Sequence, residues 1–174
     1  DYLFGILIKK SDGSSEYKYF FAKNKDEEAK IWDDFLNFID KLENFVIYHY
    51  SFYEKEILHR FTSKFGISEE LDKKIQNNII DLHQVFVQSV IFPIYFYSLK
   101  DVARFLGFNW RSLDAGGAES VIWYNDWLQK QDQKILQKII EYNEDDVRAT
   151  LFVKEWLSKQ KPHMTRSREK LPEE

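Results

Sequence analysis

Residues 135–153 read ILQKIIEYNEDDVRATLFV and predict a long helix with one charged residue on its apolar face. Six side chains recur at spacings of four and three, and so form one continuous stripe: Ile135, Ile139, Tyr142, Asp146, Ala149 and Val153. A stripe of this kind faces a hydrophobic core, where an ionised carboxylate without a partner costs several kcal/mol. We therefore expect Asp146 to lie at the edge of the stripe, beside a cation, or on a metal ion.

A second predicted helix carries another acid on its apolar face. Glu54 lies in its first turn, ahead of an apolar stripe that runs to Phe65 and stops at Gly66. If the two helices flank one sheet, Glu54 and Asp146 converge at the carboxyl ends of the strands, where α/β proteins usually place their sites. Carboxylate oxygens suit Mg²⁺ or Mn²⁺. Tyr142, one turn before Asp146, is in place to orient a metal-activated water.

Each of these residues also has a structural explanation. The helix dipole favours an acid such as Glu54 in a first turn. Asp146 is equally expected as half of an ion pair, with Arg104 or Arg111 as its partner. A tyrosine on a core-facing stripe is more often a packing residue than a catalytic one.

The other patterns along the chain predict an α/β domain. Strand-like runs come first, then strand–helix alternation, then helices, which is typical of a sheet with helices packed on it. Strands are predicted at residues 3–8, 17–21 and 45–48; helices at 26–42, about 54–66, 98–107 and, as one or two helices, 120–158; a short helix or loop at 67–78; and a brief apolar stretch at 79–82 leading into 85–87. We predict one domain over residues 1–158 and a charged tail or linker over residues 159–174.

Composition narrows the class of protein. The 174 residues are 44% hydrophobic, which suffices for one domain with a closed core. The absence of cysteine excludes disulfides and zinc–thiolate sites. No apolar run approaches the roughly 20 residues that cross a bilayer, and the start lacks the basic region of a signal peptide, so we expect a cytoplasmic protein with no membrane partner. The net charge of -4 argues against strong non-specific DNA binding but allows a local basic groove.

Two strings resemble motifs of the DEDD superfamily of 3'-5' exonucleases. His49-Tyr50-Ser51-Phe52-Tyr53-Glu54 resembles the second motif, commonly His-Asn-x-x-Phe-Asp, and Tyr142-Asn143-Glu144-Asp145-Asp146 resembles the third motif, Tyr-x-x-x-Asp, of the tyrosine-bearing DEDDy branch. Together with Ser98-Leu99-Lys100, they are similar to the ribonuclease-H-like exonuclease domains of the YprB kind and to those attached to RecB-like nucleases. The similarity covers about residues 2 to 158.

The resemblance implies a ribonuclease-H-like α/β fold, with a mixed sheet whose first three strands are antiparallel, and phosphodiester cleavage with two divalent metals. It places Glu54 at the second-motif carboxylate, Asp146 at the third-motif metal ligand and Tyr142 at the water-orienting position. Asp81 falls where relatives often have a helix-capping aspartate.

The sequence departs from the family pattern in two ways. The second motif has Glu54 where Asp is usual, and the first motif, Asp-x-Glu on the opening strand, has no counterpart. The family's first strand would end about where this sequence begins, so we expect an unpaired edge or a gap in the sheet. With two of about four carboxylates missing, the chain alone is expected to be inactive or nearly so.

Several further residues are candidates for contact with nucleic acid. His49 would contact a phosphate, although a buried structural histidine is the commoner case, and Lys100 and Arg104, with Arg111, would line the phosphate-facing side of a channel; a solvated helix face explains these cations equally well. Bases would stack on a set of aromatic residues for which core packing is the alternative: Trp110, Trp123, Trp127 and Tyr124. Gly116-Gly117 is expected to be a flexible turn.

The sequence thus predicts a metal-dependent 3'-5' exonuclease domain that acts on single-stranded ends of DNA or RNA with Mg²⁺ or Mn²⁺. Nuclease or helicase domains on the same parent chain are expected partners. The main alternative is a catalytically silent nucleic-acid-binding or scaffold domain of a larger DNA-processing protein. A third interpretation is a ribonuclease-H fold that serves only as an oligomerisation surface.

Overall fold

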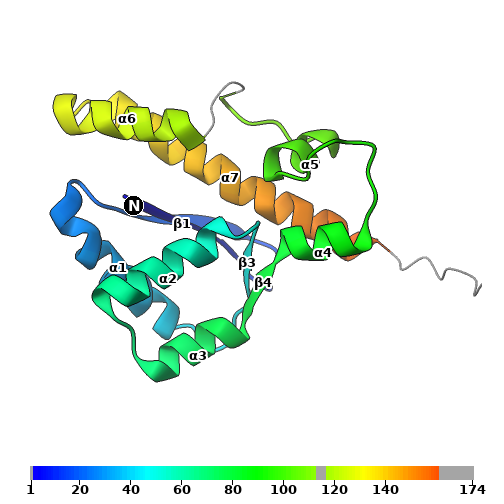
Figure 1. The fold of residues 1–174 in the computed structure, drawn as a ribbon, viewed down its shortest axis with the longest axis horizontal. Coiled ribbons are helices and arrows are strands. Elements are labelled where there is room, and N and C mark those ends of the chain that lie inside the picture. The colour runs from blue at the N-terminus through cyan, green and yellow to red at the C-terminus, as the bar shows by residue number, and fades with distance from the viewer. Residues whose placement is uncertain (1, 113–116, 161–174) are drawn as a thin grey trace, which may run out of the picture.

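The computed structural model describes residues 2–112 and 117–160. Figure 1 shows the strands between two groups of helices, with α1, α2 and α3 on one side and α6 and α7 on the other. In chain order the elements are β1 (Leu3–Lys9), β2 (Ser15–Phe21), the 3-10 helix η1 (Lys25–Glu27), α1 (Glu28–Asp40), β3 (Ile47–His49), α2 (Tyr53–Phe65), α3 (Glu69–Asn77), β4 (Ile79–Asp81), α4 (Leu82–Ser89), α5 (Leu99–Phe105), α6 (Gly117–Lys130) and α7 (Gln133–Lys159). The predicted α/β class is confirmed.

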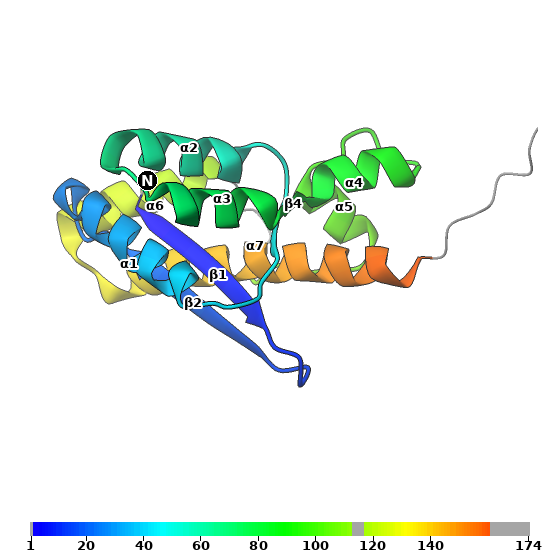
Figure 2. The same cartoon turned by 90° about the horizontal axis from the view of Figure 1, so that it is seen from below.

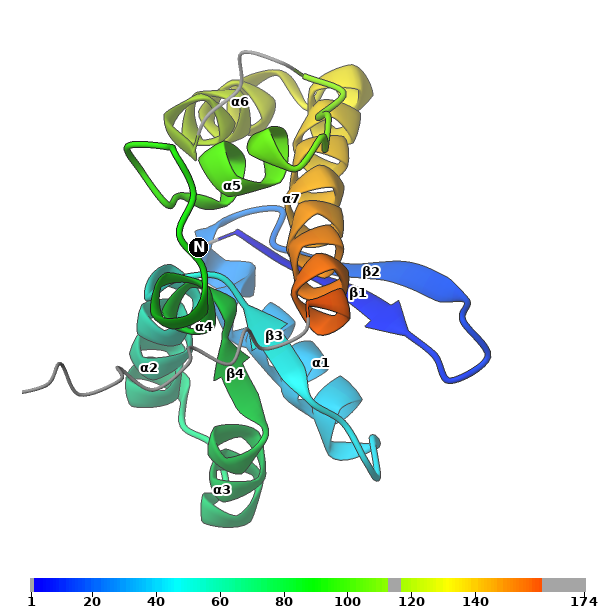
Figure 3. The ribbon, with the colours of Figure 1, turned by 90° about the vertical axis from the view of Figure 1, so that its right-hand side faces the viewer.

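The strands form two separate pairs. β1 and β2 are antiparallel, with Leu3 opposite Phe21 and Lys9 opposite Ser15, whereas β3 and β4 are parallel over three residues. Within the described residues these are two two-stranded sheets, seen as distinct pairs in Figure 3. The resemblance implied one mixed sheet whose first three strands are antiparallel. In the described residues only β1 and β2 are antiparallel, because β3 pairs with β4 in a sheet of its own, so this expectation is wrong.

Two large hydrophobic clusters lie among the elements. One is formed mainly by α1, α2 and α3 around Trp32 and Phe61, with Phe4 of β1 packed against it. The other is formed by α4, α5 and α7 around Phe86 and Val153. Helix α7 contacts β1, β3 and helices α4, α5 and α6, so this long helix joins the two regions (Figure 2).

The predicted stripe on α7 faces hydrophobic clusters along its length. Tyr142, Ala149 and Val153 are buried in the cluster around Phe86, and Ile139 is buried in a smaller cluster with Tyr124 and Trp127 of α6. Residues 120–158 form two helices rather than one because the chain turns at Gln131, whose φ is 52°, and Asp132 caps α7 by accepting a hydrogen bond from the backbone N–H of Lys134 at 2.8 Å.

Some sequence predictions are refined by the structure and others lie outside it. Residues 69–77, left open as a helix or loop, form α3 behind the N-cap Ser68. Gly117 is the first residue of α6, whereas Gly116 and residues 161–174 of the predicted tail lie outside the described residues. No helix among those described is long and apolar enough to span a membrane.

Candidate active site

Glu54 follows a tight turn at the end of β3. Ser51 in this turn has a φ of 75°, and its backbone N–H donates to Asp81 Oδ1 at 2.9 Å. The same oxygen accepts the backbone N–H of His83 at 2.9 Å and so caps α4. Asp81 therefore has the capping geometry that the resemblance implies, and it also holds the turn that leads into Glu54.

Asp146 accepts a hydrogen bond from a tryptophan and lies one helical turn from Tyr142. The indole Nε1 of Trp110 donates to Asp146 Oδ1 at 2.8 Å, and Tyr142 comes from the preceding turn of α7. Burial raises the pKa of Asp146 to about 6, with the negative charges of Asp145 and Glu54 acting in the same direction against Trp110 and Lys100. Burial and the charge of Asp146 raise the pKa of Tyr142, so its hydroxyl stays protonated at neutral pH.

Glu54 and Asp146 lie within electrostatic reach of each other, since the charge of Glu54 raises the pKa of Asp146. Glu54 is exposed, and its Oε2 lies 3.7 Å from His49 Nδ1. His49 is only 4% exposed, and neither of its ring nitrogens has a hydrogen-bond partner among the described residues. The ring thus lies beside a candidate ligand instead of on the surface, and its contact with a phosphate stays a prediction.

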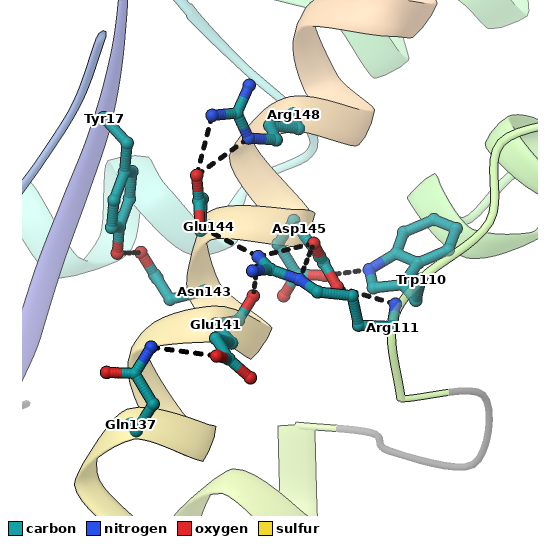
Figure 4. A network of polar contacts seen from close by, with 10 residues as sticks. Tyr17, Trp110, Arg111, Gln137, Glu141, Asn143, Glu144, Asp145 and Arg148 are labelled. Carbon is teal, nitrogen blue, oxygen red and sulfur yellow. Dashed lines mark hydrogen bonds and ion pairs between the residues drawn. The ribbon is translucent and has the colours of Figure 1, made fainter.

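The ion pair considered for Asp146 forms at its neighbour instead. Arg111 donates from Nε to Asp145 Oδ1 at 2.8 Å and from its backbone N–H to Asp145 Oδ2 at 2.8 Å. Its Nη2 also donates to Glu144 Oε2 at 2.9 Å, and Figure 4 shows this network. The prediction of Arg111 as a partner of Asp146 is therefore wrong, because the aspartate that pairs with this arginine lies one residue earlier on α7.

Lys100 is a cation that acts on Asp146, since its positive charge lowers the pKa of this carboxyl. Its Nζ lies 5.0 Å from the ring centre of Tyr142 and 5.9 Å from that of Trp110. The Arg104 guanidinium lies 5.8 Å from the same Trp110 ring. Both predicted phosphate contacts thus come from α5 on the side that faces the candidate site.

The predicted base-stacking residues are mostly core residues. Trp110, Trp127 and Tyr124 are buried, and Trp123 is half-buried with its ring edge-on to Tyr142. Stacking on the three buried rings is therefore excluded in this conformation, because packing takes up their faces. The exposed rings next to Glu54 are Phe52 and Tyr53, at 71% and 58% exposure, which lie just before the apolar stripe of α2 begins.

Helix α7 approaches β1 closely where the third-motif string begins. Gly5 of β1 leaves room for Asn143, since a Cβ at Gly5 would lie 1.6 Å from Asn143 Oδ1. The same oxygen accepts a hydrogen bond from the Tyr17 hydroxyl at 2.8 Å. This contact could not be predicted from the sequence, because the residues that form it are more than a hundred positions apart.

The oxygen donors at the site fit a hard divalent cation. Mg²⁺ is usually bound by one or two carboxylates, with water and phosphate oxygens completing its shell, and Asp146 and Glu54 supply two carboxylates. In the part of the chain that the structure describes, no three His, Cys, Asp or Glu side chains are grouped closely enough to hold a metal ion.

One comparison with known proteins gives a match. A family model described as the RNase_H superfamily matches residues 1–158, while no curated protein and no solved structure matches. The matched range includes Glu54, Tyr142 and Asp146, and the mixed α/β architecture agrees with a ribonuclease-H-like fold. The chain belongs to the ribonuclease H superfamily.

Proposed function

We propose that this domain is a nuclease of the DEDDy 3'-5' exonuclease kind, which hydrolyses phosphodiester bonds at single-stranded ends of DNA or RNA. The observation that carries the proposal is the environment of Asp146: a half-buried carboxylate that accepts a hydrogen bond from Trp110, with Tyr142 one turn before it on α7 and the negative charge of Glu54 raising its pKa. Buried acids with perturbed pKa values gather at functional sites. Ribonuclease-H-like domains are commonly nucleases that use divalent metals, which supports the assignment.

Each residue has a separate role in the proposed mechanism. Asp146 and Glu54 would hold Mg²⁺ or Mn²⁺, which supplies an activated water and neutralises charge on the phosphate. The protonated Tyr142 hydroxyl orients the attacking water. Lys100, beside Tyr142, attracts the scissile phosphate to this side of the site.

The strand would reach the site along α5 and the first turn of α2. Arg104 lies one turn from Lys100 and extends the positive side of the path. Phe52 offers an exposed ring beside Glu54 on which a terminal base would stack. His49 is buried beside Glu54 and would act on the bound nucleic acid indirectly, by its contact with the Glu54 carboxylate.

A catalytically silent nucleic-acid-binding or scaffold module is the second candidate, with nuclease or helicase domains on the same parent chain as partners. The donor set favours it: two carboxylates, one of them Glu54 where Asp is usual, form a sparser site than a two-metal mechanism needs. Under this proposal the cations and exposed rings bind the strand, and the acids contribute to a metal-supported fold.

Metal titration and cleavage distinguish the two candidates. Mn²⁺ binding is measured by calorimetry on the chain, and cleavage of end-labelled single-stranded DNA and RNA is followed on the full-length protein. Each is measured for wild type, Asp146→Asn and the control Asp126→Asn, since Asp126 is a half-buried aspartate of α6 that pairs with Lys130. An exonuclease shortens the strand from its 3' end, and only Asp146→Asn loses both binding and cleavage. Metal binding without cleavage supports the silent module, and equal cleavage by all three proteins removes Asp146 from the mechanism.

A further inference from the structure

Trp110 holds the candidate metal ligand directly. Its Nε1 donates to Asp146 Oδ1 at 2.8 Å, and the residue is only 3% exposed. A buried indole N–H usually has an acceptor, and a hydrogen bond to a carboxylate is stronger than one between neutral groups. The contact therefore fixes both the ring and the carboxylate.

The residue after Trp110 fixes the same segment to the same helix. Arg111 binds Asp145 through both its backbone N–H and its guanidinium, and its Nη2 donates to the Glu141 carbonyl at 2.9 Å. Two consecutive residues, Trp110 and Arg111, thus bind two consecutive acids of α7, Asp146 and Asp145. Figure 4 shows Trp110 and Arg111 reaching α7 from one connecting segment.

The Trp110 ring is held on its other sides as well. Phe108 packs edge-on against it, with ring centres 4.8 Å apart, and the cations of Lys100 and Arg104 lie 5.9 and 5.8 Å from its centre. An indole packed in this way is not free to change its orientation when the carboxylate moves. The side chain of Asp146 must instead adopt the orientation that Trp110 sets.

We infer that Trp110 is a positioning residue that presents the Asp146 carboxylate to a divalent cation, through the oxygen that the indole does not hold. This inference rests on the proposed function, because it takes Asp146 to be a metal ligand. Outer-shell groups that orient a ligand are worth about 10- to 100-fold in metal affinity. Neither the spacing of the acids nor the third-motif string includes Trp110, which lies 36 residues before Asp146.

The chain offers a matched control for this inference. Trp127 is as buried as Trp110, at 2% exposure, but its Nε1 has no hydrogen-bond partner within the part of the chain that the structure describes. Replacing either tryptophan with phenylalanine removes one indole N–H and a similar packing volume. Trp110→Phe alone also removes a donor from Asp146, while the remaining ring stays beneath the two cations.

Two measurements test the inference. In calorimetric titration with Mn²⁺, Trp110→Phe should bind about 10- to 100-fold more weakly than wild type, whereas Trp127→Phe should bind as wild type does; equal affinity of the two variants overturns the inference. In ¹H–¹⁵N spectra of the wild-type protein, the Trp110 indole signal should move more on addition of Mg²⁺ than the Trp127 signal. An unmoved Trp110 signal in a protein that binds Mg²⁺ also overturns it, and this readout does not require the variant to fold.

The experiments distinguish a failure of the proposed function from a failure of the inference about Trp110. If the wild-type protein binds neither ion, Asp146 is not a metal ligand and the proposed function falls with the inference. If the wild-type protein binds Mn²⁺ and Asp146→Asn does not, the function stands and only the comparison of Trp110→Phe with Trp127→Phe decides the role of Trp110.

Discussion

Arg111 Nε lies 2.8 Å from Asp145 Oδ1, so the arginine neutralises the first acid of the Asp145-Asp146 pair and leaves the second to Trp110. The two aspartates therefore have different tasks although they are adjacent in the sequence. Asp145 anchors a connecting segment through an ion pair, whereas the Asp146 carboxylate accepts its hydrogen bond from the neutral indole of Trp110. This division separates a structural acid from a candidate metal ligand.

Removing Asp145 should destabilise the fold. Asp145→Ala leaves the Arg111 backbone N–H and guanidinium without their main acceptor in a site where Asp145 is 6% exposed. We expect a loss of roughly 2–3 kcal/mol, at the lower end for a buried pair because Arg111 is partly exposed. Urea unfolding in EDTA measures it, and an unfolding midpoint equal to that of wild type would contradict the anchoring role.

Removing the charge of Asp146 should have the opposite effect on stability. The pKa of about 6 in the folded protein exceeds the ordinary value of 3.8, so the unfolded chain ionises first as the pH rises. The free energy of unfolding therefore falls by up to about 3 kcal/mol between pH 4 and 6, and it stays lower above pH 6. Asp146→Asn escapes this loss and should be more stable than wild type at pH 7 in EDTA, but equal to it near pH 4.

Added Mn²⁺ provides the internal control for that prediction. An ion that binds only the folded protein stabilises it by mass action, so saturating Mn²⁺ should raise the unfolding midpoint of wild type and leave Asp146→Asn unchanged. Equal stabilisation of both proteins by Mn²⁺ would show that the ion binds elsewhere.

The periodicity of α7 was sufficient to predict much of the candidate site. A spacing of three and four fixes which side chains share a face, and Tyr142, Ala149 and Val153 are buried as that rule requires. The same rule places Asp146 near the core, where burial raises its pKa. Local periodicity works here because the helix is long and its geometry is independent of the rest of the chain.

The partners of the two aspartates could not be predicted in this way. Asp145 and Asp146 differ by one residue, and which of them meets Arg111 depends on the path of residues 107–112 across α7. The Trp110–Asp146 contact likewise depends on tertiary packing, since no periodic pattern links residues from two different elements. A buried tryptophan usually has a polar partner, but the sequence does not say which acid supplies it.

Gly5 should be required for the seating of α7 on β1. Gly5→Ala places a methyl group 1.6 Å from Asn143 Oδ1, so α7 must shift or Asn143 must leave its site. Overpacking of this kind costs about 1–3 kcal/mol. In the double variant Gly5→Ala with Asn143→Ala, the clash is gone, and thermal unfolding should show the second substitution restoring part of the lost stability; an additive loss would contradict the contact.

Tyr142 should contribute to cleavage more than to folding. Tyr142→Phe retains the ring that packs in the core and removes the hydroxyl that the mechanism uses, so we expect at least about 100-fold slower single-turnover cleavage by the full-length protein, with Mn²⁺ affinity changed much less. Tyr124 is the matched control, because it is equally buried at 8% and its hydroxyl donates to the Ala22 carbonyl at 3.0 Å. If Tyr142→Phe and Tyr124→Phe cleave alike, Tyr142 is a packing residue.

Phe52 should bind the strand without supporting the fold. Its side chain is 71% exposed, so Phe52→Ala removes little buried surface and should leave the unfolding midpoint within error of wild type. Loss of one base-stacking ring is worth about 1–3 kcal/mol, or roughly 5- to 150-fold in affinity, which fluorescence anisotropy with a labelled single strand can resolve in EDTA. Tyr19→Ala serves as the control, since Tyr19 is an exposed ring on β2. A strand that binds both variants equally well must take a path that avoids the first turn of α2.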